Sequence, residues 1–170
     1  FLTYNFEVLQ FNGSRFFKPA FYDKIYPYYI SDILVDRDGS IWFSTQDALL
    51  HYVDGELDVY ESKSDSYWQN SLGALFEDSR QMLWIGTEDG LAKFENGVFS
   101  YFDTEHGIEG KSVYEIKEDS YGNIWLGSNG GIYFIRNENI ERDDYQFLKF
   151  GYDELDANET VFLKFDSKGN

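Results

Sequence analysis

The side chains that could do chemistry in this chain are two histidines and a large excess of carboxylates. The sequence holds 31 Asp and Glu residues, 14 Lys and Arg residues and no cysteine. It contains no nucleophile elbow, no HExxH zinc motif and no phosphate-binding glycine loop. A glycosidase would need two carboxylates at a set separation, which the order of residues does not indicate. His51 is expected in a strand and His106 in a solvated loop, so the sequence predicts no catalytic residue.

Four aspartates recur at turn-like positions, namely Asp36, Asp78, Asp119 and Asp166. The segment from Asp36 to Gly39 superficially resembles the start of a calcium loop. A calcium loop needs more oxygen ligands in order, including a late Glu, and the copies at 78 and 119 lack the second Asp. A short carboxylate also accepts hydrogen bonds from backbone N–H groups two residues on, and glycine takes the positive φ that closes such a turn. We therefore expect turn-building aspartates and neither a metal nor a cofactor.

Aromatic and amide side chains gather in segments that could bind a ligand without chemistry. Four connecting segments, 18–29, 61–71, 103–112 and 151–159, are long and unlike one another. Aromatic faces beside amides suit a sugar ring, which has an apolar C–H face and a rim of hydroxyls. The alternative is that these aromatics only pack between neighbouring sheets. The candidate ligand-binding residues are Tyr26, Tyr28, Tyr29, Tyr67, Trp68, Asn70, His106, Lys111 and Asn158.

Three tryptophans indicate which elements position these segments. Trp42, Trp84 and Trp125 are separated by 42 and 41 residues (84 − 42 and 125 − 84), and an Asp precedes each by six positions. A period of roughly 40 residues filled with strand and turn signals is typical of a β-propeller or a similar array. The sequence therefore predicts an all-β fold, a β-propeller segment of about four repeats with four-stranded antiparallel blades.

The third repeat shows the predicted strands most clearly. We expect strands at Val113–Glu118, Ile124–Ser128, Ile132–Ile135 and Ile140–Phe150, with turns at 119–123, 129–131 and 137–139. Asn-Gly and Asp-Gly pairs between apolar alternations are strong hairpin signals. The expected anchors of the innermost strands are Ile33, Leu75, Ile116 and Leu163. In such a repeat, the connections between blades share one face with the turns between the second and third strands.

The repeats divide the chain into one continuous segment, 1–170. Blades are expected at 30–60, 72–102 and 113–150, with outer strands of a partial blade at 1–17 and the start of another at 160–170. The two ends could pair and close a small ring, or lie apart as a fragment of a larger propeller. We favour the fragment, because propeller arrays of the kind that this repeat resembles run longer than four repeats.

Charge and hydropathy exclude several kinds of partner. The formal net charge is −17, which argues against nucleic acid and against an anionic membrane surface. Acidic residues on turns and outer strands also prevent the sheets from associating edge to edge. The alternative is that they give the protein a preference for neutral or cationic ligands. No run of 18 apolar residues is present, so this segment is not expected to be embedded in a membrane.

Two stretches, Glu77–Tyr101 and Glu118–Tyr133, carry a recurrent string of Glu-Asp, a turn, Trp-hydrophobic-Gly and Gly-hydrophobic. This string resembles the two-component regulator propeller repeat. The first whole repeat departs from the pattern at Ser44 and Ala48, and the second at Gln81. The structural residues of the repeat are Asp36, Trp42, Asp78, Trp84, Gly86, Asp119, Gly122, Trp125, Gly127 and Asp166.

The resemblance implies a function in sensing. Arrays of such repeats form the extracytoplasmic sensor region of membrane-bound bacterial receptors, often hybrid histidine kinases and sometimes diguanylate cyclases. The implied partners are a small molecule or oligosaccharide, bound without chemistry, and a downstream signalling module in the same chain. The resemblance leaves undecided whether the protein forms a homodimer. The implied location is the periplasmic or extracytoplasmic side of the membrane. A scaffold or protein-interaction propeller is the main alternative, and a glycan-processing enzyme is the weakest.

Overall fold

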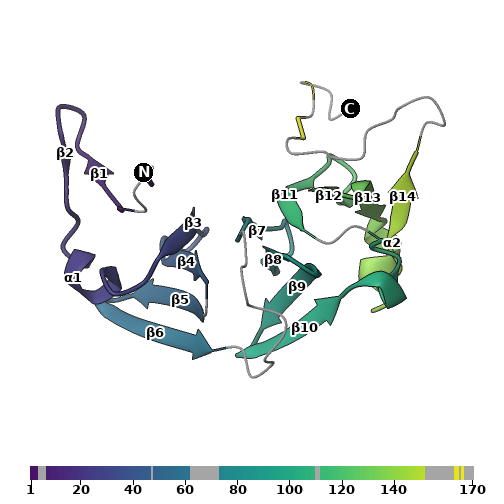
Figure 1. The fold of residues 1–170 in the computed structure, drawn as a ribbon, viewed down its shortest axis with the longest axis horizontal. Coiled ribbons are helices and arrows are strands. Elements are labelled where there is room, and N and C mark those ends of the chain that lie inside the picture. Colours follow the sequence, from purple (N-terminus) through teal and green to yellow (C-terminus); the bar gives the residue numbers. More distant parts are fainter. Residues whose placement is uncertain are drawn as a thin grey trace.

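A computed structural model describes residues 1–3, 7–46, 48–61, 73–109, 112–151, 163–164 and 166. Within these residues, three four-stranded antiparallel sheets and one two-stranded sheet follow one another along an open arc (Figure 1). Each four-stranded sheet keeps the chain order from its first strand to its last. The predicted fold class, an all-β propeller segment that does not close into a ring, is confirmed.

The three four-stranded sheets are referred to as the first, second and third blades. The first blade consists of β3 (Ile30–Val35), β4 (Ile41–Thr45), β5 (Ala48–Val53) and β6 (Glu56–Glu61). The second consists of β7 (Leu75–Glu77), β8 (Leu83–Thr87), β9 (Gly90–Glu95) and β10 (Val98–Phe102). The third consists of β11 (Val113–Glu118), β12 (Ile124–Ser128), β13 (Gly131–Ile135) and β14 (Leu148–Phe150). Strands β3, β7 and β11 lie on the concave side of the arc, and β6, β10 and β14 lie toward its rim (Figure 1).

The fourth strand of the third blade is much shorter than predicted. A helix, α2 (Asn137–Ile140), replaces the expected turn at 137–139, and β14 covers only Leu148–Phe150 of the expected Ile140–Phe150. The polar run between them does not alternate, so it cannot present one apolar face to a sheet. Ile140 and Phe147 are both 4% exposed and fix the two ends of this connection in the core. The prediction of a continuous strand here was wrong.

The N-terminal segment forms smaller pairs. Leu2 and Val8 form an isolated antiparallel bridge, and β1 (Gln10–Phe11) pairs with β2 (Phe16–Phe17). A short helix, α1 (Tyr22–Ile25), lies in the segment expected to be a loop. At the other end Leu163, Lys164 and Asp166 are described outside any strand, and the rest of 160–170 lies outside the described residues. The predicted starting strand there therefore stays a prediction.

The core lies between the sheets, in three apolar clusters. One cluster joins the N-terminal segment to the first blade, including Val8, Ile25 and Phe43. Another joins the first and second blades around Leu49 and Leu75. The largest joins the second and third blades around Trp84. Propeller blades are hydrophobic on both faces, so each blade needs a neighbour on either side to bury its apolar residues.

Every recurrent aspartate of the three blades binds the tryptophan six residues later. The Asp Oδ2 accepts from the indole Nε1 at 2.8 Å in Asp36–Trp42, 3.0 Å in Asp78–Trp84 and 2.8 Å in Asp119–Trp125. The other carboxylate oxygen accepts backbone N–H groups of the same turn. The aspartates thus close the turn and also orient the indole, which the sequence analysis did not foresee.

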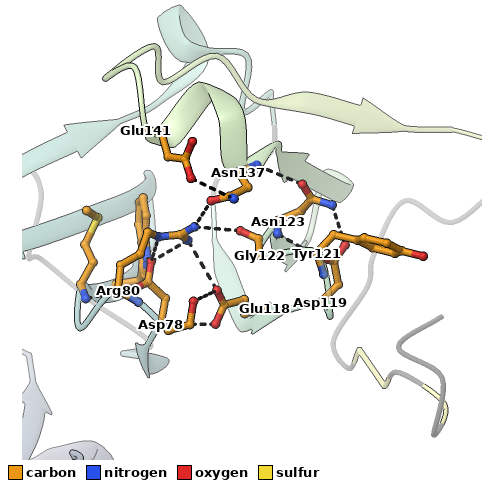
Figure 2. A network of polar contacts seen from close by, with 12 residues as sticks. Asp78, Arg80, Glu118, Asp119, Tyr121, Gly122, Asn123, Asn137 and Glu141 are labelled. Carbon is orange, nitrogen blue, oxygen red and sulfur yellow. Dashed lines mark hydrogen bonds and ion pairs between the residues drawn. The ribbon is translucent and has the colours of Figure 1, made fainter.

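A glutamate of each following blade holds the turn of the blade before it. Glu118 accepts from the Ser79 backbone N at 2.7 Å and from the Ser79 Oγ at 2.5 Å (Figure 2). Glu77 accepts from the Arg37 backbone N at 3.1 Å, so the same contact joins the first and second blades. Both glutamates stand directly before the recurrent aspartate. The blades are therefore linked by polar contacts at their turns as well as by the apolar clusters.

Candidate functional site

A cavity of 530 Å³ lies where the N-terminal segment meets the first blade. It is on the face that carries the connection into β3, the face expected to hold the ligand. Its lining residues come from the turn around Glu7, from α1 and from the segment that leads into β3. They are Glu7, Val8, Tyr22, Ile25, Tyr26, Pro27, Tyr28, Tyr29 and Ile30.

Helix α1 and the tyrosines after it owe their position to two buried anchors. Ile25 is 2% exposed and Tyr22 is 7% exposed, and Ile25 belongs to the apolar cluster beneath the cavity. Proline at position 27 cannot donate an N–H to continue a helix, so the chain turns away after one helical turn. The Tyr28 N–H donates to the Ile25 carbonyl at 3.0 Å and closes that turn. The tyrosine-rich segment is therefore held at the cavity by packing from below.

Three of the predicted ligand-binding tyrosines line this cavity in different ways. Tyr26 is 70% exposed and Tyr29 is 71% exposed, so both offer most of their surface to solvent. Tyr28 is half-buried and packs against the apolar cluster below. The Tyr22 and Tyr26 rings are 5.7 Å apart and tilted by 38°. Tyr26 and Tyr29 are thus placed to contact a ligand, whereas Tyr28 has a larger share in packing.

Polar groups gather at one wall of the cavity. The Tyr22 hydroxyl donates to Glu7 Oε1 at 3.2 Å. Lys18 Nζ lies 3.9 Å from the same Glu7 oxygen and 3.9 Å from the centre of the Tyr22 ring. Interaction with Tyr22, and to a smaller extent with the Glu7 carboxylate, raises the pKa of the Lys18 ammonium above its ordinary value. An exposed carboxylate and ammonium beside a tyrosine wall can bind hydroxyl groups of a ligand.

Of the other predicted site residues, His106 is described and does not line this cavity. His106 lies in the connection between β10 and β11, where it ends the short helix η1 (Thr104–His106). Its Nδ1 lies 3.2 Å from Asp103 Oδ1, and its ring meets the Phe102 ring edge to face. Burial opposes a low pKa for Asp103, but hydrogen bonds from the Glu105 N–H and from His106 outweigh it and lower the pKa. Tyr67, Trp68, Asn70, Lys111 and Asn158 lie outside the described residues.

Sequence reasoning missed two groups at the cavity, Glu7 and Tyr22. When the N-terminal segment is aligned with the repeat, Glu7 stands at a glycine position, and this departure from the pattern is the available signal. Tyr22 belongs to the same tyrosine-rich segment as the predicted residues. The other histidine, His51, lies in β5 as expected, stacked on Trp42 with 3.8 Å between ring centres.

The cavity has the size and lining of a binding site. Pockets for small ligands usually have volumes of roughly 300–1,000 Å³ with aromatic walls and few polar groups. Its described lining contains no Ser, Thr, Cys or His that could act as a nucleophile or base beside Glu7. Among the described residues, no three His, Cys, Asp or Glu side chains are grouped to hold a metal ion. The geometry fits reversible binding of an uncharged or polar ring.

Comparison with protein families identifies the repeat. Residues 27–47 and 107–130 match the family model described as "Two component regulator propeller". The chain is also 30% identical over 122 residues to "Histidine kinase P4" of Formosa agariphila. That alignment covers 65% of this chain but only 9% of the kinase. The resemblance to two-component regulator propeller repeats is therefore confirmed, in a chain that spans a small part of its curated relative.

Solved structures agree on the fold. The extracellular domain of a putative hybrid two component system from B. thetaiotaomicron superposes with a TM-score of 0.71 at 15% identity, covering 99% of this chain and 22% of that one. The extracellular domain of a putative one component system from the same organism gives 0.63 at 23% identity, covering 83% and 19%. A selenomethionine-substituted virginiamycin B lyase from Staphylococcus aureus gives 0.58 at 15% identity, covering 85% and 47%. Sensors and an enzyme thus share this propeller architecture.

The described helices are all short. None of them is long and apolar enough to cross a membrane.

Proposed function

We propose that this chain is the ligand-sensing propeller region of a membrane-bound bacterial signalling receptor of the two-component type. It binds a small molecule or oligosaccharide in the cavity beside α1, on the periplasmic or extracytoplasmic side, and catalyses no reaction. A kinase module in the same protein responds to occupancy. The observation that carries this proposal is the convergence of Tyr26, Tyr29 and Glu7 on a cavity of 530 Å³, with Lys18 Nζ 3.9 Å from the Glu7 carboxylate.

The comparisons support the signalling part of this proposal. A regulator propeller repeat, a histidine kinase relative and two extracellular receptor domains point to the same class of protein. The cavity supports the ligand part, since exposed tyrosine faces can stack on a sugar ring for roughly 1 kcal/mol each. With so few aromatic contacts, the affinity should be modest and spread over several loops.

A titration with a panel of oligosaccharides tests the site. The full chain and a Tyr26→Ala/Tyr29→Ala variant would be compared by calorimetry. Both tyrosines are more than two-thirds exposed, so the variant should fold normally. Removing two stacking faces should weaken binding by roughly tenfold or more. Tyr121→Ala is the matched control, because Tyr121 is 75% exposed and lies on a turn at the opposite end of the strands.

The outcomes separate the alternatives. Equal affinity in wild type and in the Tyr26/Tyr29 variant would move the site to another loop, and the Tyr67→Ala/Trp68→Ala variant would then be examined next. No binding to any sugar by the receptor's whole propeller would favour the scaffold function. Cleavage of a glycan during the titration would show that the region is an enzyme.

A further inference from the structure

A second cavity, of 730 Å³, lies between the first and second blades. It is at the opposite end of the strands from the tyrosine cavity, beside the turn at 36–40 and the turn at 96–97. Its aromatic lining consists of Trp42, His51, Tyr60 and Phe94. The Tyr60 and Phe94 ring centres are 4.7 Å apart, and Trp42 meets Phe94 at 5.5 Å. These side chains form one continuous aromatic wall.

The equivalent space between the second and third blades is filled by the chain itself. Tyr145, in the connection between β13 and β14, packs on Phe102 with 4.7 Å between ring centres and on Trp84 at 6.3 Å. Its hydroxyl accepts from Lys93 Nζ at 2.9 Å. Asn137 accepts a hydrogen bond from Arg80 through its side-chain oxygen (Figure 2). The connection that supplies these groups runs from Arg136 to Phe147, whereas Asn96 and Gly97 alone join β9 to β10.

The strand registers make the two spaces comparable residue by residue. Trp42 pairs with His51 as Trp84 pairs with Lys93. Asp38 follows Asp36 by two residues as Arg80 follows Asp78. The filled space therefore presents two cationic donors, Lys93 and Arg80, to an occupant that supplies a phenol and a carbonyl oxygen. The open space presents a carboxylate at the position of Arg80 and a histidine at the position of Lys93.

At these two positions, the open space has an imidazole and a carboxylate where the filled space has two cations. His51 lies flat on Trp42, with 9° between the rings, and its Nε2 is 2.6 Å from Ser40 Oγ. Its ring therefore does not project into the open cavity, whereas the Lys93 ammonium reaches the Tyr145 hydroxyl in the filled space. The exposed Asp38 carboxylate accepts the Ser40 N–H at 2.8 Å, and its side chain also interacts with the Asp36 carboxyl. Arg37, the nearby cation, is bound to the Asp78 and Ser79 carbonyls and approaches Glu77. Arg80, which also borders the cavity, is engaged by Asp78 and Asn137.

We propose that this cavity binds a small alkylated ammonium ion. Aromatic faces attract such cations through the ring quadrupole, and a carboxylate beside them supplies the opposite charge. An occupant that accepted a hydrogen bond as the Tyr145 hydroxyl does would find no ammonium donor at the position of Lys93, because His51 lies flat on Trp42. This site is distinct from the tyrosine cavity in the proposed function, and the two can be tested separately.

The test compares the binding of choline and of its uncharged carbon isostere, 3,3-dimethylbutan-1-ol, to the full chain. Binding is followed by calorimetry and by the indole N–H resonance of Trp42, whose proton donates to Asp36. Choline should bind at least about fivefold more tightly than dimethylbutanol, the scale of one cation–π contact. Equal affinity for the two compounds, or a Trp42 resonance that does not respond to choline, would overturn the proposal.

Variants of Asp38 test the carboxylate. Asp38→Asn keeps an oxygen that can accept the Ser40 N–H, and it should weaken choline binding about fivefold, as expected for one exposed ion pair. Asp38→Arg restores the cation found at position 80 and should abolish binding. Asp23→Asn removes the same charge from an exposed position of α1 and should leave the affinity for choline unchanged. If Asp23→Asn and Asp38→Asn weaken binding equally, the attraction is the general field of an acidic protein and the site is refuted.

Discussion

The interface between the first and second blades and the interface between the second and third blades are built on the same frame but are packed differently. Both have an Asp–Trp pair and a Glu that binds the preceding turn. Trp84 is 0% exposed, whereas Trp42 is half-buried and borders a cavity of 730 Å³. The difference comes from one connection, 136–147, which brings Tyr145 against Trp84 and Phe147 against Phe102. The recurrent residues determine the turns and contacts that both interfaces share. One variable connection determines whether the space between two blades is filled core or an open cavity.

The largest expected effect separates the two tryptophans. Trp84→Ala should reduce the free energy of unfolding by about 3–5 kcal/mol, the range for removing a large buried aromatic. Trp42→Ala should cost roughly half as much, because a half-buried ring loses less apolar contact. Urea unfolding of both variants measures the difference. Equal losses would show that the open interface is as well packed as the filled one.

Tyr145 is the next test, because it fills the closed interface. Tyr145→Ala should cost about 2–3 kcal/mol through lost ring packing and through Lys93, 8% exposed, losing its hydroxyl partner. Tyr145→Phe keeps the ring and should cost only about 1 kcal/mol. If the two variants are equally unstable, the hydroxyl rather than the ring holds the interface closed.

The Asp36–Trp42 and Asp119–Trp125 pairs are two copies of a contact that the blades share, so these two should respond alike to pH. Burial opposes a low pKa for Asp119, but bonds from the Trp125 indole and the Asn123 amide outweigh it and hold the pKa below its ordinary value. Hydrogen bonds from Ser40 and Trp42 outweigh burial in the same way and lower the pKa of Asp36. A depressed native pKa means that the carboxylate stabilises the fold above the ordinary carboxyl pKa and loses this effect as pH falls.

Asp36→Asn and Asp119→Asn should therefore each cost about 1–2 kcal/mol at neutral pH. The difference from wild type should vanish as the native carboxylates become protonated, well below about pH 4. Asp32 has the opposite behaviour, since burial raises its pKa, and its contribution to stability is lost as pH rises through that value. Urea unfolding of each variant between acid and neutral pH checks the sign. A cost that persists at the lowest pH would contradict the assignment.

The smallest effect concerns the two asparagines at the start of the third-to-fourth strand connections. Asn96 has a φ of 52°, a left-handed conformation that glycine adopts freely, so Asn96→Gly should change stability by less than about 0.5 kcal/mol. Asn137→Gly should cost about 1 kcal/mol, because it removes the acceptor for Arg80. A clear loss from Asn96→Gly, measured by thermal unfolding, would mean that this side chain also holds its interface.

Much of the fold was predictable, because its determinants are local. The aspartate and the tryptophan of each repeat fall within seven residues, and Gly39 and Gly122 close the turn in the first and third repeats. The strands on either side of the turn were predicted from the alternation of apolar and polar residues. The connection at 136–147 was not predictable in this way. A four-residue helix has no period to detect, and its stability comes from Ile140 packing against the neighbouring blade.

The candidate site was predictable only in part. Repeats kept their period while the segments between them diverged, and this contrast indicated Tyr26, Tyr28 and Tyr29. It could not show that Tyr22 would point inward from a helical turn or that Glu7, fifteen residues away, would meet its hydroxyl. The roles of Glu77 and Glu118 were hidden for the same reason, because their partners lie 40 and 39 residues earlier.

The glutamate contact between blades has a consequence for how such arrays change in length. The second and third blades carry an acceptor, Glu77 or Glu118, for the blade before them, and Arg37 and Ser79 supply the backbone donors. The first blade has Val35 at the position of these glutamates. One of the two partners is main chain, so the contact places little demand on the neighbour's sequence. Gene duplication of a repeat that carries the glutamate would therefore give the new junction both a donor and an acceptor. Copy number can drift in evolution while the junctions persist, and each new copy is free to diverge in its connecting segments.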